Sequence, residues 1–554
     1  MVNLQSSYFY GGQLIFMVWN ATNDVLFGWL SDTVPVMKSM HQSRLSMIRL
    51  GGGFWALAFL MVWFPWGGIG ASSNNSFLTG LNFTVNLCVY DAMLTLVEVN
   101  HSALLAEISV DSRERARYNS WSSICAAIGS LTSLVGHLFW KSDPKLASFR
   151  VFALFVALGS WGCFELAARF LRHVNIDKAY DGTGKGQVVA SVKRTPLNLE
   201  LDQPCGIRSK TRSYFLDSAV TKPRAMHTTK ECEDVDDAIG QAATHVIRKK
   251  NKRRSVADFL DFLGQLRRQA NFVVFAFVAS LQTFDCAFGK QFFTFFLEIL
   301  VGDALPPGVH ALTITASFLL PWLCAAALSH GIERYGFTLS ATLQGVWAAR
   351  LVLLISATLL FLASASSSLS ITASLWDLVW VRRCAALVVL LNRVMSECVC
   401  RLVPLVQSDL IDEFSFLSSG SSSSSSISGV GSGAQESKAA SIVGTVNFIS
   451  KPSQSLGPIL GFAVLSRILP QITQKQNGVE GGIGTNAYDA AASALATFGE
   501  PTSTERGEVA LLVIVLPLVC VCLQLQLWRQ FTLKGRYLAR VKKFLNYGIE
   551  GSAV

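Results

Sequence analysis

Long apolar stretches recur along the whole chain, and they limit its fold more than any other feature. Of its 554 residues, 51% are hydrophobic and only 15% are charged, whereas soluble domains carry about 25% charged residues. A helix needs about 20 mostly apolar residues to cross a bilayer. The apolar runs are continuous rather than alternating, which favours helices over a barrel. We therefore predict an all-α, polytopic membrane protein.

Eleven stretches are long enough to span a bilayer. Five precede a long polar segment and six follow it, which predicts two helical bundles. The stretch 384–410 carries the most charge. The predicted spans are 9–31, 47–66, 77–108, 118–140, 148–171, 271–300, 307–330, 338–364, 384–410, 439–469 and 508–530.

The polar segment between the bundles is strongly basic. Residues 172–268 hold 19 of the 47 Lys and Arg residues of the chain. Between membrane spans, such a loop marks the cytoplasmic side and attracts the anionic lipids of the inner leaflet, so we do not expect nucleic-acid binding. Basic and poorly basic loops alternate along the chain, which places the C-terminus in the cytoplasm and the N-terminus outside.

These patterns predict the domain organisation of a monomeric protein, with the plasma membrane as its expected location. The two low-complexity segments cannot bury a core and are expected to be disordered. The predicted parts are an N-terminal bundle at 1–171, a largely disordered basic loop at 172–254, an amphipathic surface helix at 255–268, a C-terminal bundle at 269–533 that includes a disordered serine-rich loop at 414–438, and a cytoplasmic tail at 534–554.

Asp24 is a carboxylate inside the first apolar stretch. Such a charge costs about 2.5–3.5 kcal/mol on insertion scales, so it usually faces a bundle interior on an ion or substrate path. Asn20 and Asn23 share its helical face. We expect these three residues to form an oxygen-lined cation site for a sodium ion or a proton, with no resident cofactor or metal.

Three further charges inside apolar stretches are expected to bind substrate. Asp91 and Glu98 are seven residues apart, two helical turns, so both side chains point the same way. Lys451 lies deep in an apolar span beside Pro452. A buried lysine requires a carboxylate partner or a depressed pKa.

Other charged residues in the spans are interpreted as structural. Arg393, Glu397 and Arg401 recur at i, i+4 and i+8 on one helix and can neutralise one another. Asp285 and Lys290 lie near the middle of one span, five residues apart and therefore less well aligned, and they too are interpreted as structural.

Smaller motifs add little to this interpretation. Asn74 and Asn82 begin glycosylation sequons in or near a predicted outside loop. The cysteines, such as Cys398 and Cys400, are interpreted as packing residues rather than metal ligands. The chain carries no nucleophile elbow or Walker A motif, and an enzyme is not expected.

Several motifs resemble those of known transporters. The stretch from Trp19 to Asp32 is similar to the asparagine–aspartate signature of the glycoside–pentoside–hexuronide:cation symporters, the melibiose-permease group of the major facilitator superfamily. The transmembrane protein 180 family of the same superfamily is more similar still. Its patterns recur as Asn23-Asp24-Val25-Leu26-Phe27-Gly28-Trp29-Leu30-Ser31-Asp32, Ala103-Leu104-Leu105-Ala106-Glu107, Asn392-Arg393-Val394, Lys451-Pro452 and Gln530-Phe531-Thr532-Leu533.

The resemblance implies a cation-coupled symporter of a small polar solute, with a sugar as one candidate. It implies that Asn23 and Asp24 bind the cation and that Glu98 binds substrate. Two departures are that Asn20 replaces an acid and that residues 1–8 are too short for the family's first helix, which is therefore expected to be missing. The alternatives are a lysolipid carrier on the same scaffold and a transport-inactive scaffold that uses the basic loop.

Overall fold

The structure is a computed structural model of the chain, and every regular element in its described residues is a helix. Contacts divide the chain into one unit formed by Met1–Val174 with Leu260–Val554, and a second formed by Asn175–Phe259. Both predicted bundles lie in the first unit, which contains all the features discussed below. The structure describes residues 6–33, 40–64, 76–139, 147–181, 256–366, 379–421, 438–468 and 503–551.

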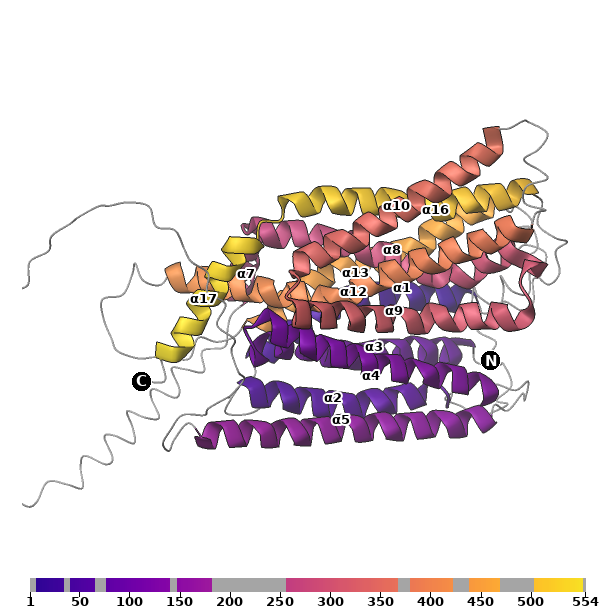
Figure 1. Cartoon of the computed structure of the whole chain (residues 1–554). Coiled ribbons are helices and arrows are strands. Elements are labelled where there is room, and N and C mark those ends of the chain that lie inside the picture. The colour runs from indigo at the N-terminus through magenta and orange to yellow at the C-terminus, as the bar shows by residue number, and fades with distance from the viewer. Residues whose placement is uncertain are drawn as a thin grey trace, which may run out of the picture. The chain divides into compact units, whose positions relative to one another are not determined.

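Each predicted span lies on one long helix (Figure 1). Two helices run well beyond the predicted bounds, because polar residues at their ends continue the backbone hydrogen bonding outside the apolar run. The long helices are α1 (Ser6–Thr33), α2 (Met40–Met61), α3 (Ser76–Ile108), α4 (Ser112–Phe139), α5 (Ala147–Asp181), α8 (Ala270–Val301), α9 (Pro307–Tyr335), α10 (Leu339–Ser366), α12 (Val379–Ser421), α13 (Ala439–Ile468) and α16 (Ser503–Gln530).

The two long extensions change the predicted loops. Helix α5 continues to Asp181 and α12 to Ser421, so 172–181 and 414–421 are helical rather than disordered. The rest of the basic loop and of the serine-rich loop lies outside the described residues.

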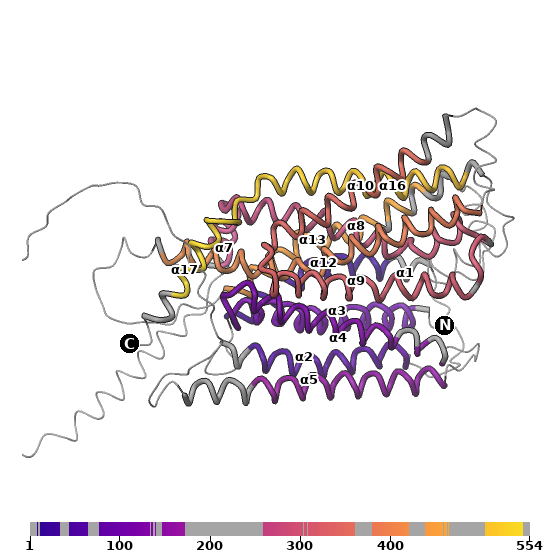
Figure 2. Tube along the Cα trace, in the orientation of Figure 1, coloured from indigo at the N-terminus to yellow at the C-terminus, as the bar shows by residue number. Residues whose placement is uncertain are grey.

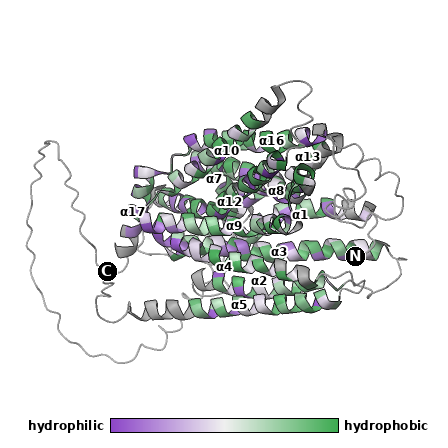
Figure 3. Cartoon of the chain, turned by 45° about the vertical axis from the view of Figure 1, so that its right-hand side comes forward, coloured by the Kyte–Doolittle hydropathy of each residue, from purple (hydrophilic) through white to green (hydrophobic). Residues whose placement is uncertain are grey.

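Six of the described helices are long and apolar enough to cross a membrane by length and composition: α3, α5, α8, α9, α10 and α16. In the other long helices, polar and charged side chains interrupt the apolar run. Hydrophobic residues line the lengths of the helices, and hydrophilic residues gather at the end near α17 (Figure 3). The chain is therefore an integral membrane protein.

Helix α1 packs closely against α13, which brings the first predicted span against the tenth (Figure 2). Glycines make this contact possible. A Cβ atom added to Gly28 would lie 2.5 Å from the carbonyl oxygen of Ala440, and one added to Gly444 would lie 2.4 Å from that of Asp24. Only glycine allows backbones this close, so the interface between the bundles is built on direct backbone contact.

Two shorter helices lie at the end of the bundles where the basic loops are predicted. Helix α7 (Val256–Arg267) lies where the sequence predicts an amphipathic helix, and its buried Phe262 meets Phe414 of α12 edge to face. Helix α17 (Gly535–Gly551) was not predicted from the sequence, which assigned these residues to the tail. It runs obliquely across the end of the bundles and packs on α12 (Figure 1).

Candidate functional site

The first feature of the site is an ion pair between the bundles. Asp24 on α1 is 1% exposed, and its Oδ2 lies 2.7 Å from Nζ of Lys451 on α13. Asn447, one turn before Lys451, donates its side-chain amide to Oδ1 of Asp24 at 3.2 Å. The close packing of α1 on α13 therefore gives the intramembrane carboxylate the cationic partner that such a position requires.

Asn20 and Asn23 lie within about one turn of Asp24 on α1 and carry two further side-chain oxygens. The amide of Asn23 donates to Oδ2 of Asp91 on α3 at 2.6 Å. This bond turns the oxygen of Asn23 away from Asp91. Its Oδ1 and that of Asn20 are buried and accept no hydrogen bond in the described part of the chain. Buried oxygens without donors are costly, so they mark a place where a cation or protonated group would be stabilised.

The three predicted substrate residues surround the same point but differ in exposure. Asp91 is buried, and Lys451 donates to the Thr95 hydroxyl at 3.1 Å. Glu98 is exposed, and the charge of Lys451 acts on it. Asp91 thus joins the oxygen cluster through Asn23, whereas Glu98 is left accessible to a solute.

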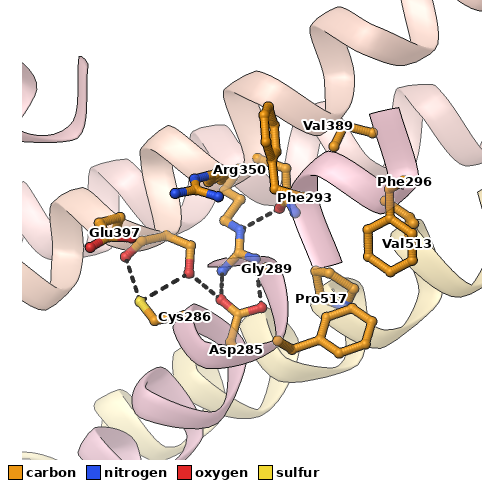
Figure 4. Close-up of a pocket in the computed structure, with 14 residues that line it drawn as sticks. Asp285, Cys286, Gly289, Phe293, Phe296, Arg350, Val389, Glu397, Val513 and Pro517 are labelled. Atoms are coloured by element: carbon orange, nitrogen blue, oxygen red, sulfur yellow. Dashed lines mark hydrogen bonds and ion pairs between the residues drawn. The ribbon is translucent and has the colours of Figure 1, made fainter. Parts of the chain in front are cut away.

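Asp285, which the sequence groups with Lys290, has its charged partner on another helix. Both of its oxygens accept from the Arg350 guanidinium of α10, at 2.5 and 2.8 Å, and the Ser396 hydroxyl also donates to it (Figure 4). Asn392 accepts from Nε of Arg350 at 2.7 Å. Sequence reasoning missed Arg350, although it is the one charged residue in the predicted span 338–364, which was the available signal.

This cluster borders a small cavity inside the C-terminal bundle. The cavity encloses about 20 Å³, room for one water molecule. Its polar wall holds Asp285, Arg350, Arg393 and Glu397, and its apolar wall holds aromatic and aliphatic side chains such as Phe296 (Figure 4). Asp285 and Arg350 are almost fully buried and satisfy each other, so the loss of either would leave an unpaired buried charge and destabilise the bundle.

The predicted charged stripe on α12 is only partly a chain of ion pairs. Arg401 pairs with Glu397 at 2.5 Å. Arg393 donates to the backbone oxygens of Ser317 and Lys290, and its guanidinium lies against two phenylalanine rings. The three residues therefore connect α12 to α8 and α9 as well as to one another.

Two cysteines interpreted as simple packing residues meet instead. Cys286 of α8 and Cys400 of α12 form a disulfide, with their Cα atoms 7.4 Å apart. The helical spacing of Cys398 and Cys400 sends these side chains to different faces, so Cys398 stays a buried free thiol. The sequence could not indicate the pair, because its members are 114 residues apart.

A second set of ion pairs joins the bundles at the end that was predicted to be cytoplasmic. Arg115 of α4 is 1% exposed and binds Asp412 of α12 through two nitrogens, at 2.7 and 2.9 Å. Asp409, one turn earlier, binds Lys542 of α17 at 2.7 Å. Lys542 also donates to the Ser112 hydroxyl at the start of α4. Helix α17 thus connects both bundles through one lysine.

The end of α1 makes a third connection. Asp32 binds Arg44 at 2.8 Å and accepts from the backbone N–H and the hydroxyl of Ser441 at 2.7 and 2.6 Å. Ser441 lies in the first turn of α13, where a carboxylate is stabilised by the unpaired N–H groups and the helix dipole. Arg44 also binds Glu107 of α3. Sequence reasoning singled out none of these residues as a contact.

Two predictions remain: the glycosylation sequons at Asn74 and Asn82, and the expectation that no metal is bound. Asn82 lies in α3 at 7% exposure and accepts a hydrogen bond from Asn86, which argues against a glycan on it. Asn74 lies outside the described residues. Among the residues that the structure describes, no group of three or more His, Cys, Asp and Glu side chains has the geometry of a metal site.

Comparison with known proteins gives two relatives that match nearly the whole chain. Transmembrane protein 180 of Mus musculus is 27% identical over 546 residues, which cover 96% of this chain and 87% of that protein. Transmembrane protein 180 of Gallus gallus is 26% identical over 544 residues with the same coverage. No family model matches the chain.

Among solved structures, the chain is similar to a bacterial homologue of the iron transporter ferroportin, crystallised in an outward-facing state with soaked iron. The TM-score is 0.50 at 13% identity, over 95% of this chain and 90% of that chain. This likeness concerns the fold alone. The chain shares the fold of that structure and resembles, over nearly its whole length, the proteins named Transmembrane protein 180.

Proposed function

We propose that the chain is a cation-coupled secondary transporter, a symporter that moves a small polar solute across the plasma membrane by alternating access. The observation that carries the proposal is the Asp24–Lys451 ion pair, which joins the two bundles at a cluster of buried oxygens without donors. In this site Lys451 pairs with the Asp24 carboxylate, while the two asparagine oxygens have no donor among the described residues. A cation or a proton can take the place of the lysine.

The exchange couples ion binding to bundle contact. A cation bound by Asp24, Asn20 and Asn23 competes with the ammonium group of Lys451 for the same carboxylate. A buried ammonium cannot stay uncompensated, so it must move toward Asp91 or Glu98, whose charges already act on it. Because Lys451 belongs to α13 and Asp24 to α1, the exchange changes the contact between bundles, and each ligand favours one arrangement.

The three polar connections between the bundles at the predicted cytoplasmic end fit this cycle. Arg115–Asp412, Lys542–Asp409 and the Asp32 contact with α13 all hold the bundles together at the predicted cytoplasmic end. Alternating access requires that they separate when the site opens to that side. Polar, charge-assisted contacts can break in water more easily than an apolar interface of equal size, because water replaces the lost hydrogen bonds.

The test is uptake by the full chain in reconstituted vesicles under imposed sodium and proton gradients. The solutes are sugars, amino acids and small phosphorylated compounds. We expect gradient-driven uptake by the wild type and its loss in Asp24→Asn. The matched control is Asp261→Asn, which changes an exposed aspartate of α7. Uptake that is driven by a gradient and unchanged in Asp24→Asn would contradict the assignment of the ion site.

A further inference from the structure

Among the charged groups near Glu98, the acidic ones belong to the N-terminal bundle and the basic ones to the C-terminal bundle. The N-terminal bundle contributes the carboxylates Asp91 and Glu98, which remain after Lys451 has paired with Asp24. The facing helices of the C-terminal bundle contribute Lys290 on α8 and Arg401 on α12. Helix α3, which carries both carboxylates, packs directly against α12, which carries Arg401.

Arg401 is held in a form that suits an oxyanion. Its guanidinium stacks on the Trp322 ring with 3.7 Å between the guanidinium carbon and the ring centroid. One of its nitrogens binds Glu397, and its Nε is buried and donates to no group in the described residues, although the side chain as a whole is 30% exposed. A flat, stacked guanidinium with a donor left over binds carboxylate or phosphate with little loss of side-chain entropy.

Lys290 supplies a second cation on the same side. Its side chain is exposed, and within the described ranges its ammonium group has neither an ion-pair nor a hydrogen-bond partner. Its backbone is anchored, because Arg393 donates to its carbonyl oxygen at 3.3 Å and lies between the rings of Phe293 and Phe318. The backbone of Lys290 is thus held in place, while its exposed ammonium group has no partner in direct contact among the residues that the structure describes.

Both cations act on the carboxylate across the boundary. Arg401 and Lys290 interact electrostatically with Glu98, as Lys451 does. We infer that the site takes a zwitterionic solute, whose carboxylate or phosphate group binds Arg401 and Lys290 and whose ammonium group binds Glu98. The inference rests on the proposed function and narrows it, since a neutral sugar bound between the two charged sides would separate them and offer neither side an opposite charge in return.

The structure explains how such a solute would assist the transport cycle. It would neutralise the acidic side of one bundle and the basic side of the other at once, and so favour the arrangement in which Glu98 and Arg401 face each other. A solute with a single charge would satisfy only one bundle. The net attraction between bundles therefore depends on both charged groups being in the same molecule.

The test measures binding by the full chain in lipid nanodiscs, through the shift of its thermal unfolding midpoint. The probes are phosphoethanolamine and glycine as zwitterions, ethanolamine and glycerol phosphate as single-charge controls, and glucose as a neutral control. A parallel series uses lysophosphatidylethanolamine, which carries the same headgroup as a lipid. The variants are Arg401→Gln and Lys290→Gln, with Arg169→Gln, an exposed arginine of α5, as the matched control.

We expect a zwitterion to raise the midpoint more than either single-charge probe does, and each of the two variants to weaken its binding about tenfold or more. Arg169→Gln should bind as the wild type does. A larger shift with the lysolipid than with phosphoethanolamine assigns the zwitterion to a lipid headgroup; the reverse assigns it to a free solute.

Two results would overturn the inference: no shift with any zwitterion, or a shift that Arg401→Gln and Lys290→Gln leave intact. Failure of this inference can be distinguished from failure of the proposed function. Zwitterion binding without gradient-driven uptake keeps this inference and contradicts the transporter. Asp24-dependent uptake of a neutral sugar by a chain that binds no zwitterion supports the transporter and contradicts this inference.

Discussion

Lys451 holds Asp24 at 2.7 Å across the boundary between the two bundles, and this pair is the point at which ion binding and bundle contact meet. The two residues are on α13 and α1, the helices whose glycines allow direct backbone contact. Any change in the charge of either residue therefore acts on the interface and not only on a local site.

Removal of one member of this pair should cost far more than removal of both. Lys451→Met leaves the Asp24 carboxylate buried and unpaired, and breaking a buried pair in this way costs about 3–5 kcal/mol of unfolding free energy. The double variant Lys451→Met with Asp24→Asn removes the charge as well and should recover most of that loss. Thermal unfolding of the purified chain measures both. Equal losses in the single and double variants would show that the pair is not buried as described.

The glycine contact predicts a variant that separates α1 from α13. Gly444→Ala would place a Cβ atom 2.4 Å from a backbone oxygen of α1, which the chain can relieve only by moving one helix. We expect a greater distance between spin labels placed on the ends of α1 and α13. Gly129→Ala is the control, because a Cβ atom added there meets nothing within 4 Å. An unchanged distance in Gly444→Ala would mean that this contact does not set the spacing.

The ion pair between Arg115 and Asp412 should govern opening at the predicted cytoplasmic end. Arg115→Gln leaves Asp412 buried without its bidentate partner, at a cost of about 3–5 kcal/mol to the closed arrangement. Cysteines introduced along α4 and α12 should then react faster with a water-soluble thiol reagent. The charge exchange Arg115→Asp with Asp412→Arg should restore protection. If Arg115→Gln alone stays fully protected, this pair does not hold the end closed.

Docking of α17 should depend on pH through Glu413, which lies beyond the predicted membrane span. Burial raises the pKa of Glu413, against hydrogen bonds from Asn271 and Tyr537 that lower it. A raised pKa in the folded chain means that the stabilising contribution is complete below the unfolded value near 4.5 and is lost as pH rises through the folded value. At neutral pH the ionised carboxylate therefore costs stability.

Glu413→Gln removes that cost while its amide oxygen can still accept from Asn271 and Tyr537. We expect the variant to gain thermal stability over the wild type as pH rises from about 4.5 to 7, and to match it at lower pH. Tyr537 stays neutral over this range, since burial and the nearby Glu413 raise its pKa to about 12. A stability difference that does not change with pH would contradict the role of Glu413.

Local composition was enough to predict the long helices, because the apolar length that a bilayer requires is visible within one stretch of about 20 residues. Partners across the fold were less predictable. Asp285 and Lys290 are close in sequence, but five residues turn a helix by about 140°, so their side chains point apart and the sequence indicates no partner for Asp285. Its true partner, Arg350, is 65 residues away. The charged tail gave no strong apolar run, so helix α17 was missed.

Asp24 itself was identifiable from the sequence as an intramembrane charge, and so were Asn23, Glu98 and Lys451. Their pairings were not, because helices separated by hundreds of residues can meet on any face. Only the packing of α1 on α13 assigns Lys451 to Asp24, and only the packing of α3 on α12 sets Glu98 against Arg401. Charge in an apolar segment is a local property of the chain, whereas which charges neutralise one another depends on how the helices pack.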